Sequence, residues 1–217
     1  MIRNLGAILL IGATLGFVLY HLYKFSVSIN NPKSKLIGQL KNMRETILEK
    51  FQDFVPMELD EFKRLSAEVI KVGMLKIGSQ YGMIKSIFNE DLVYFQLEKT
   101  AVENTTLLYV KSANLDVGFM RISDQTDIYQ NGVKIGNIDQ DYNLKDYLGN
   151  VIGGIIFDDN ERFKLVFQNE KVCQILKPAH ISVPGNTRLL NDINESILPS
   201  NDLVQSLLFF YMINELS

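Results

Sequence analysis

The residue types that support metal binding or nucleophilic chemistry are scarce in this chain of 217 residues, and they lie far apart. The sequence has two histidines, His21 and His180, and one cysteine, Cys173. No two of them have the spacing of a metal-ligand set. Cys173 falls in the middle of a predicted strand, where a small buried apolar side chain is the expected role. A single cysteine also excludes a disulfide within the chain.

Two acidic turns are the remaining candidates for chemistry. Segment 139–143 reads Asp-x-Asp-x-Asn and begins like a calcium loop, but Leu144 and Asn150 stand where that loop needs a glycine and a glutamate. The acidic segment 158–161 is predicted to be a solvated turn. No P-loop, nucleophile elbow or dinucleotide fingerprint occurs. We therefore predict that the protein is not an enzyme and has no catalytic, cofactor-binding or metal-binding residue.

The stretch from Leu5 to Tyr23 is 19 residues long and contains no charged side chain. A bilayer core requires roughly 20 helical residues, and Tyr20 and Tyr23 fit the aromatic belt at its boundary. We predict that residues 1–30 form a single-pass transmembrane anchor. A cleaved signal peptide and a buried core helix remain as alternatives.

The anchor also bears on partners and orientation. Gly12 and Gly16 form a G-x-x-x-G pair that allows close approach of a partner helix, although glycine is frequent in membrane helices anyway. No acidic residue precedes Glu45, whereas several lysines follow the anchor. By the positive-inside rule this pattern favours a cytoplasmic or matrix-side main domain.

Residues 31–72 are predicted to be an amphipathic helical segment. Pro32 suits a first helical position, and apolar residues then recur with helical spacing, which predicts a helix over 32–55. Its apolar face could lie on the bilayer or pack on protein. A second helical stretch follows, and segment 73–89 stays ambiguous because three glycines interrupt it.

From Leu92 the pattern becomes that of short strands separated by turns. This spacing predicts an antiparallel sandwich or barrel. The strongest hairpin signal is Asn131-Gly132, because a type I′ turn needs positive φ at both positions. The predicted strands are Leu92–Leu97, Thr106–Lys111, Gly118–Ser123, Val133–Ile138, Val151–Phe157, Arg162–Gln168 and Lys171–Leu176.

A short repeat runs through these strands. The pattern Gly-x-x-Ile-Gly-x-Ile occurs at 132–138 and again at 149–155, with a degraded copy at 169–175. A β-bulge at the intervening glycine would return both isoleucines to one face and bend the strand. Ordinary hairpins that happen to contain glycine are the alternative.

The terminal stretch from Leu203 to Leu216 is predicted to be a helix with Asn201 or Asp202 as its cap. Residues 207–213 are apolar on every side, so this helix must be surrounded by protein. It is too short to span a bilayer. A sheet wrapped around the helix satisfies both conditions.

The hairpins at 128–138, 145–156 and 163–178, together with the apolar terminal helix, resemble the tubby C-terminal-like superfamily. That superfamily includes the phospholipid scramblases and the LURP-one-related proteins. The resemblance covers about residues 88–217 and implies a closed barrel of about twelve strands around the helix. It also implies membrane association and, in some members, lipid binding. Scramblases of this family usually carry their membrane helix at the carboxy end, whereas this chain has its apolar stretch near the amino end.

The sequence thus predicts an α+β protein with three parts: an anchor in 1–30, a helical segment in 31–72, and a tubby-like β-barrel with a C-terminal core helix in 73–217. We expect a non-enzymatic module that contacts lipid or acts as a scaffold at a membrane. Its partners would be membrane lipids, or proteins bound through the 32–55 helix or the Gly12/Gly16 face. An accessory subunit of a larger membrane complex is the alternative, and scramblase-like activity is a remote one. The net charge of −3 argues against a nucleic-acid partner.

Overall fold

The computed structural model describes residue 14 and residues 16–20, 32–50, 54–65, 70–76, 78–86, 88–100, 105–158, 161–177 and 188–216. The chain divides into two compact units, Met1–Gln39 and Leu40–Ser217. Of the predicted anchor, only Thr14 and residues 16–20 are described, and they are helical. Gly12, His21 and His180 lie outside the described residues. None of the helices in the described part of the chain is both long enough and apolar enough to cross a bilayer.

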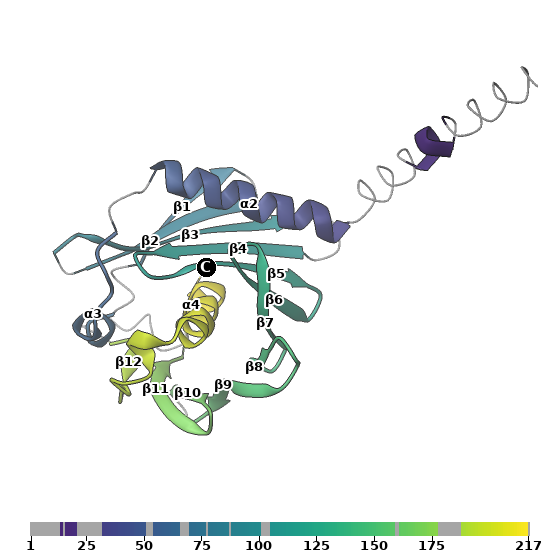
Figure 1. Ribbon diagram of the computed structural model, residues 1–217. Helices are drawn as coiled ribbons and strands as arrows, with labels where there is room; N and C mark the ends of the chain where they lie inside the picture. Colours follow the sequence, from purple (N-terminus) through teal and green to yellow (C-terminus); the bar gives the residue numbers. More distant parts are fainter. Residues whose placement is uncertain are drawn as a thin grey trace, which may run out of the picture. The chain divides into compact units, whose positions relative to one another are not determined.

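Twelve strands form one antiparallel sheet in which the spatial order is the chain order (Figure 1). The strands are β1 (Ile70–Lys76), β2 (Ser79–Lys85), β3 (Asp91–Thr100), β4 (Thr105–Ser112), β5 (Asp116–Ile122), β6 (Gln125–Gln130), β7 (Val133–Ile138), β8 (Asn143–Asp146), β9 (Val151–Phe157), β10 (Arg162–Phe167), β11 (Glu170–Leu176) and β12 (Leu190–Asn191). The helices are α2 (Pro32–Lys50), α3 (Leu59–Lys63), the 3-10 turn η3 (Leu198–Ser200) and α4 (Asp202–Leu216).

Several strands agree with the sequence-based prediction. β7 and β9 have the predicted bounds, and β3, β4, β5, β10 and β11 differ from it by one to three residues at their ends. The ambiguous segment contributes β2 and part of β1, and β1 begins at Ile70, within the stretch predicted to be helical. β6, β8 and β12 were not among the predicted strands. Asn131 and Gly132 have φ of 51° and 78°, which confirms the predicted hairpin turn.

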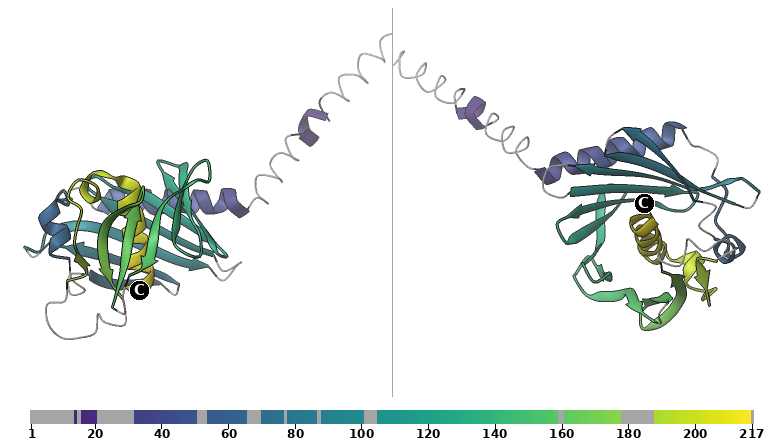
Figure 2. Two further views of the ribbon diagram at one scale, coloured as in Figure 1. Left: turned by 90° about the horizontal axis from the view of Figure 1, so that it is seen from below. Right: turned by 180° about the vertical axis from the view of Figure 1, so that it is seen from behind.

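The helix α4 lies inside the curl of the sheet, as Figure 1 and the right view of Figure 2 show. Every residue from Val204 to Ile213 is buried. Aromatic rings from different elements pack on α4. The ring centroid of Phe119 in β5 lies 5.2 Å from that of Phe210, and the ring centroid of Phe62 in α3 lies 6.5 Å from that of Phe209. The prediction of a helix enclosed by protein is therefore confirmed.

The prediction of a closed barrel is wrong. The sheet has eleven strands of four to ten residues and the two-residue β12, and β1 and β12 do not pair with each other where they are described. The segment 54–65 fills the opening instead. Val55 donates its N–H to the carbonyl oxygen of Asp91 at 3.1 Å, and the carbonyl oxygen of Leu65 accepts from the N–H of Leu189 at 2.8 Å. Phe62, fully buried, lies between these two contacts along the chain. A short helix thus closes the core where a strand pair would close a barrel.

The part of α2 from Leu40 onward covers the opposite face of the sheet from α4 (Figure 1). Leu40, Met43 and Ile47 are buried but do not belong to the inner core cluster. β3, β4 and β5 are consequently buried on both faces, which explains their nearly continuous apolar sequences. The predicted 32–55 helix is too long: α2 ends at Lys50, and Val55 is not helical.

The predicted β-bulges occur in all three copies of the repeat. One residue of the second strand has no opposite partner in each hairpin: Ile135 in β7, Ile152 in β9 and Val172 in β11. Each bulge falls one residue before the position that was predicted. The glycine that follows has a different role, because a Cβ at Gly136 would lie 2.5 Å from the carbonyl oxygen of Lys145 in the next strand. The bulges place Ile135 and Ile152 against the core, as expected.

Candidate functional site

The segment that resembled the start of a calcium loop forms the turn between β7 and β8. Asp139 Oδ1 accepts the N–H groups of Asp141 and Asn143 at 3.1 and 2.9 Å. Its Oδ2 accepts the side-chain amide of Asn143 at 3.1 Å and lies 3.0 Å from Lys145 Nζ. Desolvation opposes ionisation of this carboxyl, but the hydrogen bonds from Asn143 and Lys145 outweigh it and hold the pKa of Asp139 below its usual value. The carboxylate therefore stabilises its own turn.

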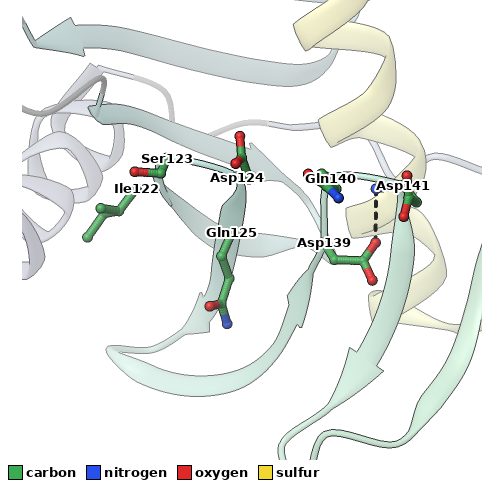
Figure 3. A pocket seen from close by; sticks show the side chains of 7 residues that line it. All are labelled: Ile122, Ser123, Asp124, Gln125, Asp139, Gln140 and Asp141. Carbon is green, nitrogen blue, oxygen red and sulfur yellow. Dashed lines mark hydrogen bonds between the residues drawn. The ribbon is translucent and has the colours of Figure 1, made fainter.

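A shallow cavity of about 430 Å³ lies beside this turn. Its residues come from the β5–β6 turn and the β7–β8 turn (Figure 3). In Figure 3 the carboxylate of Asp139 is bonded back to the backbone of Asp141. Within the described part of the chain, no group of three or more His, Cys, Asp and Glu side chains is arranged to hold a metal ion. The lining residues are Ile122, Ser123, Asp124, Gln125, Asp139, Gln140 and Asp141.

The turn between β8 and β9 has the same pattern of hydrogen bonds to its first aspartate, but its tip is apolar. Asp146 Oδ1 accepts the N–H groups of Leu148 and Asn150, both at 2.9 Å, and Oδ2 accepts the Asn150 side-chain amide at 3.0 Å. Hydrogen bonds, chiefly the one from that amide, lower the pKa of Asp146. Tyr147 and Leu148 lie at the tip of this turn, and they are 75% and 69% exposed to solvent. A rigid polar frame thus holds two large apolar side chains in solvent.

A groove of about 390 Å³ is lined by residues of β8, β9 and β10 and of the β10–β11 turn. Gly154 lies opposite Asn143 on one side and Val166 on the other, and a Cβ at Gly154 would lie 3.0 Å from the carbonyl oxygen of Tyr142. Val151 and Ile156, on either side of it in β9, are 61% and 45% exposed. The lining residues are Asn143, Val151, Ile152, Gly153, Gly154, Ile156, Val166, Gln168 and Asn169. We call Tyr147, Leu148, Val151, Ile156 and this groove the β9 surface.

Lysines around the sheet are neutralised by aspartates. Five of them have a carboxylate oxygen within 3.0 Å of Nζ, and this pairing lowers the excess positive charge available to an anionic ligand. Most of these side chains are partly exposed, and Asp127 is buried. The pairs are Lys85–Asp91, Lys134–Asp127, Lys145–Asp139, Lys164–Asp158 and Lys171–Asp192.

A tighter ionic cluster attaches α2 to the sheet. Arg44 donates from Nε and Nη2 to Asp116 Oδ2 of β5 at 3.1 and 2.9 Å. The hydroxyl of Tyr109 also donates to Asp116. Desolvation raises the pKa of Asp116, but the bonds from Arg44 and Tyr109 lower it further, so the net direction is down. Burial, followed by the bond to Asp116, raises the pKa of Tyr109. The cluster is charged and bonded internally, which fits a structural role.

Cys173 lies where the sequence placed it, in a strand and fully buried. Burial raises the pKa of its thiol to about 12, so the nucleophilic thiolate is strongly disfavoured. In the acidic segment 158–161, Asp158 is half-buried and pairs with Lys164 at 3.0 Å. The β9 surface was not foreseen. Its signal in the sequence is the run Val151–Phe157, which is apolar at outward-facing as well as inward-facing positions.

Comparison of the chain with family models, with curated proteins and with solved structures finds no match.

Proposed function

We propose that this chain is a non-enzymatic, single-pass membrane-anchored module that contacts lipid or acts as a scaffold at a membrane surface. The observation that supports this most directly is the exposed apolar β9 surface beside an interior that α4 already fills. A contiguous exposed apolar region is typical of a contact surface. The apolar stretch Leu5–Tyr23 supports the anchor, and the lysines that follow it support a cytoplasmic or matrix-side domain.

The arrangement of the domain supports a place in the tubby C-terminal-like superfamily. Twelve antiparallel strands enclose an apolar C-terminal helix, and three hairpins carry bulges at equivalent positions. Under this proposal the opening between β1 and β12, which segment 54–65 fills, is a departure from the family's closed barrel. The paired lysines support contact with neutral apolar surfaces over binding of anionic headgroups.

An accessory or structural subunit of a larger membrane complex is the second candidate. Leu40, Met43 and Ile47 of α2 are buried in the Leu40–Ser217 unit, and Leu48 is half-buried. A protein partner would therefore bind the β9 surface or the predicted Gly12/Gly16 face of the anchor rather than this stripe.

Two experiments on expressed protein test the proposal. The full chain is expected to resist carbonate extraction from membranes, whereas a variant without residues 1–28 is expected in the soluble fraction. Extraction of the full chain by carbonate would contradict the anchor. Purification of the full chain in mild detergent, read by mass spectrometry, then separates the two candidates: co-purifying proteins in constant ratio would support the accessory subunit.

A further inference from the structure

The two faces of the sheet bury different kinds of side chain. In the described part of the chain, the cluster around α4 consists of aliphatic, methionine and phenylalanine side chains, with Cys173 and Tyr211 as the exceptions. The face away from α4, which we call the outer face, buries tyrosines together with an amide and a carboxylate. Tyrosine is enriched at the centre of contacts between proteins, so the outer face has the composition of a contact surface. Its buried residues with polar atoms in β3, β4 and β6 are Tyr94, Gln96, Thr105, Tyr109, Asp127 and Tyr129.

α2 is seated on this face by an apolar contact and an ion pair. A Cβ at Gly118 would lie 3.3 Å from Leu40 Cδ2, so the side chain of Leu40 fills the space that the glycine leaves. One turn further along α2, Arg44 Nη2 donates to Asp116 Oδ2 at 2.9 Å. An apolar side chain in a depression, with an arginine on a carboxylate one turn away, is the way an amphipathic helix is recognised by a groove. The row of paired residues that contains Gly118 is Gln96, Tyr109, Gly118 and Tyr129.

The closed arrangement leaves one buried acceptor unsatisfied. Gln96 is 7% exposed and donates from Nε2 to Glu98 at 3.2 Å, but its buried Oε1 accepts no hydrogen bond from the described residues. A buried acceptor without a donor opposes this arrangement, because water would satisfy it on an uncovered face. The side chain of Arg44 is 37% exposed, so solvent screens its pair with Asp116. Both features favour release of α2 over opening of the cluster around α4.

We propose that the Leu40–Glu49 part of α2 is a reversible cover, which detaches from the outer face while the sheet and α4 stay folded. The structure describes the closed state, in which neither the apolar stripe of α2 nor the face beneath it is available to another protein. Release presents both surfaces. The inference goes beyond the proposed function and does not depend on the predicted membrane anchor.

The chemistry of the closed contact also defines the kind of partner that the outer face accepts. That partner is a protein with an amphipathic helix, whose apolar residues have the spacing of Leu40, Met43 and Ile47 and whose arginine takes the place of Arg44 on Asp116. α2 competes with such a helix for the same face. The cover thus controls access to a helix-binding surface.

The test compares one thiol in each layer of the same molecule. Gln96→Cys places a thiol on the outer face, and the native Cys173, which is fully buried, belongs to the inner cluster. A maleimide on a long polyethylene glycol chain reacts with the full chain in mild detergent only where the protein opens. We expect Gln96→Cys to react about tenfold faster than Cys173 or more, because a local opening exposes the outer layer alone. Reaction of both thiols in urea gives the intrinsic rates for comparison.

A second substitution shows whether α2 is the element that opens. Asp116→Asn removes the ion pair with Arg44 and is expected to raise the rate at Gln96→Cys roughly tenfold, with the rate at Cys173 unchanged. The matched control is Glu45→Gln, also at an ion pair of α2. Glu45 is paired with Lys41 on the exposed side of the helix, so the control should change neither rate.

The proposal is overturned if Gln96→Cys reacts no faster than Cys173, or if Asp116→Asn fails to raise its rate selectively. Should Gln96→Cys not fold, hydrogen exchange of Asp116→Asn in the otherwise unchanged chain replaces it. The amides of α2 from Leu40 to Glu49 should then exchange roughly tenfold faster than in wild type, and those of α4 at the same rate. An acceleration that is absent from α2 or shared by α4 would overturn the proposal equally. Carbonate extraction tests the proposed function separately.

Discussion

The two helices that cover β3, β4 and β5 from opposite sides are built differently. α4 is apolar all round, and every residue from Val204 to Ile213 is buried. In the Leu40–Glu49 part of α2, Leu40, Met43 and Ile47 form one buried stripe while the remaining side chains are half-buried or exposed. An enclosed helix has no free face for another function, whereas a helix on the surface keeps one. α4 is therefore a core element of the domain, whereas the described part of α2 from Leu40 onward keeps an exposed side.

The largest effect is expected from a charge inside the curl of the sheet. Leu208→Asp and Phe210→Asp lie on different faces of α4, and each should destabilise the protein by several kcal/mol, comparable to the whole stability of a domain. Asn42→Asp on the exposed side of α2 is the control and should be nearly neutral. Soluble yield and thermal melts of the full chain in detergent measure the difference. Tolerance of either α4 variant would mean that α4, like α2, has a free face.

A smaller effect is expected from Ile47→Ala on α2. Ile47 is 1% exposed, and removal of a buried isoleucine side chain down to Cβ costs about 2–5 kcal/mol. Hydrogen exchange should show lost protection in α2 with little change in α4. If α2 and α4 lost protection together, the two helices would belong to one cooperative unit, and the prediction that α2 unfolds independently of α4 would be wrong.

The ion pair beneath α2 should contribute less. We expect Asp116→Asn to cost about 1–2 kcal/mol, because Arg44 is partly exposed and the bidentate bond is screened by solvent. The pKa of Asp116 is lower in the folded state, so its contribution is present above the unfolded pKa of about 3.9 and is lost as pH falls through the folded value. The difference in unfolding free energy between wild type and variant should therefore be constant above about pH 5 and shrink below about pH 4. If the difference in unfolding free energy did not change with pH, the ion pair between Arg44 and Asp116 would not be its cause.

The smallest effect is expected from Gly118→Ala under α2. An added Cβ would lie 3.3 Å from Leu40 Cδ2, which forces a slight displacement, while alanine restricts the unfolded chain. The two effects oppose each other, so we expect a change of less than about 1 kcal/mol in thermal unfolding. A loss several times larger would show that α2 is packed as tightly as α4.

Local patterns in the sequence predicted a large part of the fold. Asn131-Gly132 has the positive φ values expected of its turn, and Asn201 caps α4 by accepting the N–H of Val204 at 3.1 Å. The apolar run in α4 predicted enclosure because no surface could accept all of its faces. The repeat predicted three bulges, and the error of one residue arose because Gly136 and Gly153 were assigned to the bulge itself. They instead allow the next strand to approach closely.

Contacts between distant segments could not be predicted in this way. The segment 54–65 that fills the opening in the sheet is bonded through Leu65 to Leu189, which is far away in the chain and has no spacing relation to it. The β9 surface depends on which side of a bulged strand each residue faces, and the bulge at Ile152 shifts that alternation. The pairing of Lys145 with Asp139 and of Lys164 with Asp158 also depends on the register of adjacent strands.

The position of α4 after all twelve strands has a consequence for biosynthesis. Chains are made from the amino end, and the ribosome completes the entire inner face of the sheet before it begins the helix that covers that face. Until α4 is made, Phe95, Phe119 and the other side chains of the inner face are exposed to water or bound by a chaperone. The newly made chain is therefore most exposed to aggregation in the interval between the completion of β12 and the completion of α4.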